Sequence, residues 1–297
     1  MVPNIDPYAE YHQRLIDMAT AAINEAIDVL KQQSMQKSIP IIMGLPENRP
    51  GNTGEISISI EKSVHEIDIS PISIKCVESI LKGHSAGLIA LEKAHRIIAT
   101  QSVEFCLVGG VDSYIEPETL EWLEKNEQIH QPINAWGFIP GEAACFCLVC
   151  SKETAKKYNL EIQAELLAIS TQNEQNKIKT ESINLGEGLT QAVRDVTQML
   201  PAGSKLDYMI CDQNGEAYRA DEFGFMLTRL SEIFNEPSNY MTPADCWGDV
   251  GAASGPLFIN QVCAAIQRGY EKGLYTLLWT SSEGGERTAA IFTGKKE

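Results

Sequence analysis

The side chains with the clearest chemical potential are His84 and Ser85, which lie within residues 83–87. This segment reads Gly-His-Ser-Ala-Gly. An amphipathic helical pattern follows it, and then an apolar run that ends in Gly109 and Gly110. A turn of this kind places one side chain at a helix N-terminus, where unpaired N–H groups and the helix dipole favour developing negative charge. The turn is therefore the first candidate for a nucleophile or a general base.

The same five residues fit Gly-x-Ser-x-Gly, the nucleophile elbow of α/β-hydrolases and malonyl acyltransferases, in which Ser85 would be the nucleophile. In hydrolases an acid and then a His follow that Ser along the chain. The five His residues here are His12, His65, His84, His95 and His130. The last of them precedes both Asp212 and Asp249, the acidic residues of interest, so the hydrolase order of acid and then His is not met. Residues 77–82 also have a helical pattern, so we expect no strand before the turn. The alternative role for Ser85 is that of a helix N-cap.

Five segments in chain order resemble the β-ketoacyl synthases, the condensing enzymes of the thiolase fold. Residues 85–91 resemble the Ser-Ser-Gly-Leu-x-Ala-Leu segment that follows the family's reactive Cys, and this match puts His84 in the place of that Cys. The other segments resemble its Phe-x-x-Gly-Glu-Gly-Ala, His-Gly-Thr-Gly, Gly-His-Thr-x-Gly-Ala-Ala-Gly and Phe-Gly-Phe-Gly-Gly motifs, at residues 138–144, 212–215, 248–255 and 281–285. The resemblance runs from about residue 14 to residue 293.

The resemblance implies an α/β protein with the thiolase-like layered αβαβα fold, built from two pseudo-repeated halves. We place these halves at residues 1–152 and 153–297. Alternating helical and buried-strand patterns agree with α/β layering. The chain begins almost at the helical pattern of residues 10–31, so part of the usual N-terminal edge is expected to be lacking, unless the true start lies upstream. Residues 55–60 alternate Ile with Ser or Glu and predict a half-exposed strand.

The resemblance puts Asp212 and Asp249 where the condensing enzymes have two His residues that polarise the carbonyl and the carboxylate. An ionised carboxylate only accepts hydrogen bonds, and it would repel a malonyl carboxylate and a thioester enolate. His84 also replaces the thiolate, which is the activated nucleophile of this chemistry. We therefore predict that ordinary ketoacyl synthesis is lost.

The resemblance also implies that His84, Asp212 and Asp249 lie close together, and three interpretations follow. They could form a buried ion-paired cluster with a charged imidazole. They could bind a divalent metal, since one imidazole and two carboxylates can make an open facial site. Or His84 and one Asp could act as a base and its orienting partner on Ser85 or on water. We favour the structural cluster and predict no metal and no cofactor, because ion-pair networks form without catalysis.

Four residues near these positions are candidates for lining a substrate pocket: Trp247, Glu283, Gly284 and Gly285. Glu283 stands in the place of the gating Phe, which would make the mouth of the pocket acidic. Trp247 could instead be a core residue. Arg219, at the start of a helical pattern, is expected to form a surface salt bridge, with anion binding as the alternative.

The net charge of −16 speaks against nucleic acid and anionic membranes, which need a basic surface. It also argues against docking of an acyl carrier protein, which is itself acidic. No run of about 18 apolar residues occurs, so no membrane span is expected. Five of the eight Cys residues lie in apolar, strand-like runs, which favours reduced thiols and a cytoplasmic protein, bacterial by its resemblance.

Two function classes follow from these residues. The first is a ketosynthase-like protein that has lost condensing activity and serves in binding or scaffolding. The second is a divergent acyltransferase or hydrolase that uses His84 with Asp212 and Asp249, or Ser85, on an acyl or other carbonyl substrate. The resemblance implies a homodimer in which residues 105–109 pair with their mate across a two-fold axis. The resemblance is also compatible with an acyl or other small-molecule ligand.

Overall fold

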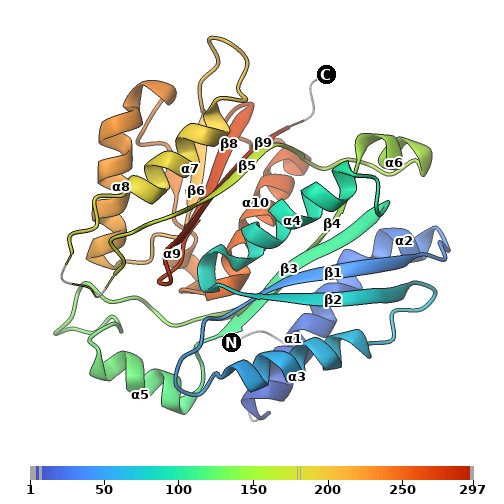
Figure 1. Ribbon diagram of the computed structural model, residues 1–297, viewed down its shortest axis with the longest axis horizontal. Helices are drawn as coiled ribbons and strands as arrows, with labels where there is room; N and C mark the ends of the chain where they lie inside the picture. Colours follow the sequence, from blue (N-terminus) through green and yellow to red (C-terminus); the bar gives the residue numbers. More distant parts are fainter. Residues whose placement is uncertain (1–4, 7–8, 179, 181, 295–297) are drawn as a thin grey trace. The chain divides into compact units, whose positions relative to one another are not determined.

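The computed structural model describes residues 5–6, 9–178, 180 and 182–294 (Figure 1). Contacts divide the chain into two compact units. Unit 1 consists of Met1–Trp122, Pro140–Ile162 and Val250–Leu257, and unit 2 consists of Leu123–Ile139, Gln163–Asp249 and Phe258–Glu297. The chain passes between the units several times, so the predicted division at residue 152 stays a prediction about the two repeated halves.

The first part of the chain alternates helices with strands. Its elements are α1 (Tyr11–Ala26), α2 (Asp28–Gln32), β1 (Ser38–Leu45), α3 (Gly54–His65), β2 (Ser73–Leu81), the 3-10 turn η1 (Gly83–Ser85), α4 (Ala86–Ala99), β3 (Phe105–Ser113), α5 (Pro117–Lys125), β4 (Glu142–Cys150) and α6 (Lys152–Lys157). The four strands form one sheet in the order β2-β1-β3-β4. Strand β1 is parallel to β2 and β3, and β4 is antiparallel to β3.

The core of unit 1 lies on both faces of this sheet. Helices α1 and α3 contact one face, and Phe105, Leu107 and Val111 of β3 share a buried cluster with their side chains. Helix α4 contacts β1 and β3. Successive residues of a strand point to opposite faces, so a strand covered on both faces is apolar along its whole length. All nine residues of β3 are buried accordingly.

The second part of the chain also alternates helices with strands. Its elements are β5 (Glu165–Asn173), α7 (Glu187–Thr197), β6 (Tyr208–Cys211), α8 (Ala217–Leu230), the 3-10 turn η2 (Ser231–Ile233), β7 (Tyr240–Met241), α9 (Ala244–Trp247), the 3-10 turn η3 (Gly251–Ala253), α10 (Ser254–Arg268), β8 (Tyr275–Ser281) and β9 (Glu286–Thr293). The sheet has the order β5-β9-β8-β6-β7. Strand β6 is parallel to β7 and β8, whereas β9 is antiparallel to β8 and β5.

The two sheets repeat one topology. The path β1-α3-β2-α4-β3-β4 corresponds element by element to β6-α8-β7-α10-β8-β9, and the corresponding strands pair in the same order and sense. This confirms the predicted pair of similar halves. Strand β5 precedes α7 and pairs with β9, but no strand within the described residues precedes α1 or pairs with the outer edge of β4. The edge expected to be lacking is therefore the counterpart of β5.

Three local predictions were wrong. Residues 55–60 belong to helix α3, because Ser57, Ile60 and Val64 recur at helical spacing and are buried, while Ile58 is 59% exposed. Residues 77–81 belong to strand β2, because they pair with β1 in parallel. Residues 105–109 cannot pair with a second copy, because β1 and β4 occupy both edges of β3.

Candidate functional site

His84 and Ser85 lie in the turn η1 between strand β2 and helix α4, so the predicted turn is present and a strand precedes it. Gly83 begins the turn with φ +51, a left-handed conformation that glycine adopts without strain. The start of α4, directly after the turn, packs closely on β1, since a Cβ on Gly44 would lie 2.8 Å from Ala86 Cβ. His84 is 5% exposed and Ser85 is fully buried. Ser85 occupies the N-cap position of α4 as the alternative interpretation expected, but its side chain makes no capping hydrogen bond.

A second turn of the same construction, η3, leads into α10. Gly251 begins it with φ +49, as Gly83 begins η1. A Cβ on Gly87 would lie 2.3 Å from Pro256 Cδ, and a Cβ on Gly255 would lie 2.8 Å from Leu88 Cγ. Pro256, which follows Gly255, thus packs against Gly87, and Leu88, which follows Gly87, packs against Gly255. The two helix starts come this close only because neither position carries a side chain.

Asp112, at the end of β3, holds the turn η3 in place. Its Oδ2 accepts a hydrogen bond of 2.9 Å from the Ala252 N–H, and its Oδ1 accepts one of 2.6 Å from Arg49 Nη2. Burial lowers the pKa of the Arg49 guanidinium, but the Asp112 carboxylate and nearby hydroxyls outweigh this, and the net shift is upward. Neither Asp112 nor Arg49 was a candidate from sequence. The available signal was the position of Asp112 directly after the apolar run of residues 105–111.

Asp212 directly follows β6 and accepts hydrogen bonds from two other segments of unit 2. Its Oδ2 accepts hydrogen bonds from Arg219 Nη1 at 2.9 Å and from the Ser281 N–H at 2.6 Å. Arg219 Nη1 also donates to the Ser281 carbonyl at 3.0 Å. The side chains of Arg219 and Asp212 are 1% and 2% exposed, so the salt bridge that we expected for Arg219 is present but lies in the interior.

Asp249 belongs to the same hydrogen-bond network as Asp212. Its Oδ2 accepts from Asn214 Nδ2 at 2.6 Å, and Asn214 Nδ2 also donates to Glu216 Oε2 at 2.9 Å. Glu216 Oε2 in turn accepts from Arg219 Nε at 3.3 Å. Asp212 and Asp249 are therefore connected through Arg219, Glu216 and Asn214. Neither Asn214 nor Glu216 was a candidate from sequence, although both lie within four residues of Asp212.

His84 lies in unit 1, whereas Asp212 and Asp249 lie in unit 2. The predicted proximity of His84 to the two carboxylates therefore stays a prediction. Within the part of the chain that the structure describes, no group of three or more His, Cys, Asp and Glu side chains could hold a metal ion. The three interpretations of His84, Asp212 and Asp249 therefore all stay predictions.

The buried network is rich in acceptors. Asp212, Glu216 and Asp249 each contribute a carboxylate, and Arg219 contributes the guanidinium that two of them contact. Burial lowers the pKa of Arg219, but Tyr218 and the surrounding carboxylates outweigh this and raise it, so Arg219 stays charged. Ionised carboxylates donate no hydrogen bonds. The expectation that Asp212 and Asp249 act as hydrogen-bond acceptors, and not as donors to a substrate oxygen, therefore stays a prediction.

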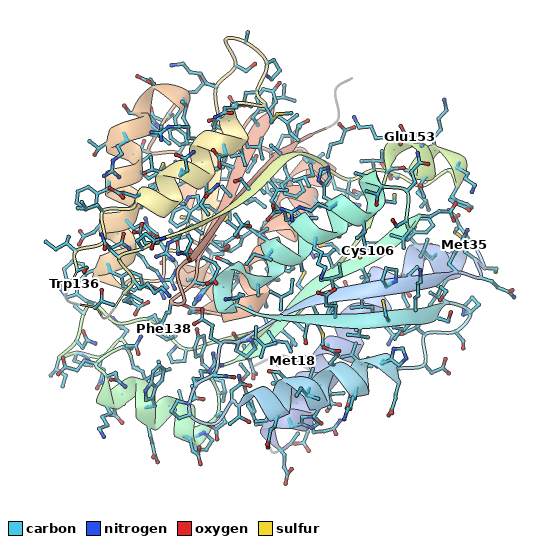
Figure 2. All side chains as sticks on the ribbon, viewed as in Figure 1. Met18, Met35, Cys106, Trp136, Phe138 and Glu153 are labelled. Carbon is cyan, nitrogen blue, oxygen red and sulfur yellow. The ribbon has the colours of Figure 1, made fainter. Side chains whose placement is uncertain are left out.

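Glu283 joins this network through Gln128. Gln128 Nε2 donates to Glu283 Oε1 at 3.2 Å and to Glu216 Oε1 at 3.4 Å. The Phe138 N–H donates to the Gln128 carbonyl at 2.8 Å and fixes the backbone of Gln128. Phe138 is 3% exposed, whereas Trp136, two residues earlier, is 68% exposed. Figure 2 labels both side chains. Glu283, which we expected to make the mouth of a pocket acidic, is therefore hydrogen-bonded to Gln128 within unit 2.

The remaining candidates lie in the loops around this network. Gly284 and Gly285 belong to the turn between β8 and β9, and Gly285 has φ +113. A Cβ on Gly285 would lie 2.9 Å from Asn173 Oδ1. Trp247 ends α9, next to Gly248, and its side chain is only partly buried, so it is not a residue of the hydrophobic core.

A second buried ion pair on α8 holds the same hairpin of β8 and β9. Arg287 Nε donates to Glu222 Oε1 at 2.6 Å, and both side chains have no exposed surface. The Ser281 hydroxyl donates to Glu222 Oε2 at 2.6 Å. Glu222 lies three residues after Arg219, so both side chains are on one face of α8. Helix α8 thus fixes the end of β8 through two separate charges.

Comparisons with known proteins agree with the fold. A scan of family models finds no match, and a search of curated protein sequences finds none either. Among solved structures, the ketosynthase from module 6 of the Bacillus subtilis bacillaene synthase is 14% identical, with a TM-score of 0.76 over 99% of this chain and 59% of that one. The ketosynthase from module 1 of the Bacillus amyloliquefaciens bacillaene synthase is 16% identical, with a TM-score of 0.72 over 99% of this chain and 60% of that one.

A third similar structure is a complex of a type II polyketide acyl-carrier protein with its ketosynthase bound to a hexaketide, AntDE:AntF. It is 14% identical, with a TM-score of 0.71 over 97% of this chain and 86% of that one. The fold of this chain is therefore that of the ketosynthases, the thiolase-like condensing fold. The chain spans about three fifths of the bacillaene synthase chains that it matches. No helix of the described residues is long and apolar enough to cross a membrane.

Proposed function

We propose that this ketosynthase-like protein has lost condensing activity and serves as a binding or scaffolding protein. The observation that carries the proposal is the engagement of Asp212 by Arg219 and the Ser281 N–H. A condensing enzyme needs hydrogen-bond donors at this position for the thioester oxygen. A carboxylate already neutralised by a buried guanidinium contributes to stability and to the position of the β8–β9 hairpin, and it offers no donor.

The turn of His84 supports the same proposal. A condensing enzyme transfers the acyl group to a thiolate at the helix N-terminus, and an imidazole cannot form that thioester. The purified protein should therefore give no β-ketoacyl product from acyl and malonyl thioesters, with an active ketosynthase assayed in parallel. A product that disappears in His84→Ala would overturn the proposal.

One observation favours the second candidate function, a divergent acyltransferase or hydrolase. Strand β2, turn η1 and helix α4 present His84 and Ser85 in the order strand, turn, helix, which the nucleophile elbow requires. Such an enzyme would release free acid from an activated acyl ester, and Ser85→Ala would abolish this while His84→Gln would slow it. Hydrolysis that does not change in either variant would exclude the elbow.

We also propose that the chain forms a homodimer, through the free edge of β2 in place of β3. Among the described strands, β2 pairs only with β1, and its nine residues include no Pro or Gly to block further pairing. Its Cys76 is exposed in the single chain, as is Cys246 in α9. If β2 is covered, Cys76 should be alkylated much more slowly than Cys246 at micromolar concentration. Light scattering that shows a monomer, with equal alkylation of the two thiols, would contradict the dimer.

An acyl carrier protein is a partner in the AntDE:AntF complex. For this chain we propose that no such partner is needed, because its net charge of −16 opposes an acidic partner. Titration of labelled acyl carrier protein at low ionic strength is the direct check, because attraction between charged surfaces is strongest there. Binding in the micromolar range would show a local basic surface and overturn this part of the proposal.

A further inference from the structure

Unit 2 contains a cavity of about 60 Å3, partly open to solvent, between α10 and the sheet. Its walls are apolar: Ile210 of β6, Met241 of β7, and Val262, Ala265 and Ile266 of α10. One buried water needs roughly 10–15 Å3, so the cavity is several times larger than a hydration site. Ligand sites in proteins have mostly apolar walls with a few polar groups. The cavity therefore has the lining of a small-molecule site and room for a short chain.

The cavity exists because small residues meet there. Ala265, Gly273 and Gly294 line it and carry a methyl group or no side chain. A Cβ on Gly294 would meet only Ile266, at 3.6 Å, which is an ordinary contact. Protein interiors are normally packed without such gaps, and apolar cavities stay dry and accept apolar molecules. The apolar wall therefore selects an aliphatic group.

The rim of the cavity supplies hydrogen-bond donors. The side chains of Tyr208, Gln261 and Lys272 line it, and none of them makes a hydrogen bond or an ion pair with any other residue that the structure describes. Burial raises the pKa of the Tyr208 hydroxyl, so this group stays protonated and can donate. Glu271, next to Lys272, is the acidic residue at the rim.

We propose that this cavity binds a short-chain aliphatic molecule with an acceptor head group, its chain against α10 and its head at Tyr208 and Lys272. The site is distinct from the network of Asp212. Tyr208 begins β6, whereas Asp212 follows the last residue of that strand, so the two sites lie at opposite ends of β6. The inference does not depend on whether condensing activity has been lost.

Calorimetric titration of the full chain with hexanoate and with 1-hexanol tests the proposal. Both probes should bind, because the walls contact the shared alkyl chain. Hexanoate should bind more tightly, and Lys272→Met should remove its advantage while leaving hexanol unchanged. Absence of binding by both probes overturns the site, and equal binding of the two by the wild-type protein overturns the role of Lys272.

Filling the cavity provides the structural control. Ala265→Phe should weaken hexanol binding at least about tenfold, which is about 1.4 kcal/mol. Ala264→Phe is the matched control, because it makes the same change one residue earlier on α10, at a position that does not line the cavity. If Ala265→Phe does not fold, Gly294→Val is a second substitution that enlarges a residue lining the cavity. Equal binding by wild-type, cavity-filling and control proteins places the ligand elsewhere and refutes the proposal.

Discussion

Arg219 Nη1 donates to Asp212 Oδ2 across 2.9 Å, in a pair whose side chains are 1% and 2% exposed. The same guanidinium nitrogen binds the Ser281 carbonyl, and the same carboxylate oxygen accepts the Ser281 N–H. The pair therefore connects the end of β6, helix α8 and the end of β8. Asp212, which the resemblance places at a catalytic position, is therefore hydrogen-bonded to both α8 and the end of β8.

The first prediction concerns the stability of this pair. Arg219→Met leaves Asp212 buried without its cation, and such a loss costs about 3–5 kcal/mol of unfolding free energy. The double variant Arg219→Met/Asp212→Asn should recover part of this loss. Urea unfolding of the wild type, Arg219→Met, Asp212→Asn and the double variant gives the coupling energy. The exposed pair of Lys93 and Glu78 is the control, and Lys93→Met should cost less than about 1 kcal/mol. Similar losses for Arg219→Met and Lys93→Met would contradict the structural role.

The second prediction concerns the reciprocal glycines. Gly87→Ala places a Cβ 2.3 Å from Pro256 Cδ and should destabilise the protein by about 1–3 kcal/mol. Pro256→Ala removes the opposing atoms and should restore part of the stability in the double variant. Gly224→Ala is the control, because nothing lies within 4 Å of that Cβ on α8, and it should stabilise by about 0.5–1 kcal/mol. Thermal unfolding of the four variants measures these differences, and a neutral Gly87→Ala would contradict the close approach.

The third prediction concerns pH. Hydrogen bonds from Lys157 and then from Lys37 lower the pKa of Glu104 to about 2. A lowered folded pKa gives stability that is present above the ordinary carboxyl value of 4.5 and is lost as pH falls toward about 2. Glu104 is 39% exposed, so screening limits the effect to less than about 1 kcal/mol. Lys157→Met should therefore cost stability at about pH 6 and almost none at about pH 2.

Lys156→Met is the matched control for this pH dependence, because Lys156 lies on the same helix, α6, and makes no ion pair among the described residues. Its effect on the urea midpoint should be small at both pH values. A loss in Lys157→Met that is the same at high and low pH would show that Glu104 is not the partner that matters.

The fourth prediction concerns the restored thiol. His84→Cys returns the family's nucleophile to the turn but leaves Asp212 and Asp249 as acceptors. We expect no β-ketoacyl product from this variant by mass spectrometry, even where intact-mass analysis detects acylation of the introduced thiol by an activated thioester. Condensation by His84→Cys alone would show that the two carboxylates are compatible with the chemistry.

The sequence predicts most of the fold where helical period and apolar runs are unambiguous, as in α4 and the paired strands β8 and β9. The sequence pattern fails at α3, because Ile alternates with polar residues there although the segment is a helix. It also fails at β2, because parallel pairing with β1 overrides the helical pattern of residues 77–81. Long-range pairing of this kind leaves no trace within a short window of sequence.

The candidate site is predicted in part. The order of motifs located Asp212 and Asp249, but not the residues that hold them. Asn214 and Asp249 are 35 residues apart, and Arg219 and Ser281 are 62 apart, so their hydrogen bonds depend on the folded topology. The burial of Arg219 was missed for the same reason. A charged residue at a helix start is normally exposed, and only the folded position of β8 beside it shows that Arg219 is buried.

Among the described strands, the first sheet ends in two open edges, β2 and β4, and this decides how copies of the chain can add to one another. Pairing of β2 with β2 across a two-fold axis closes after two copies. Strand β4 then still presents main-chain donors and acceptors on its outer side, in a run that is apolar from Ala143 to Cys150. Such an edge is a template for further strands. A dimer built on β2 therefore carries one such β4 edge on each copy within the described residues, and a segment that pairs with β4 would add there without disturbing the β2 pairing.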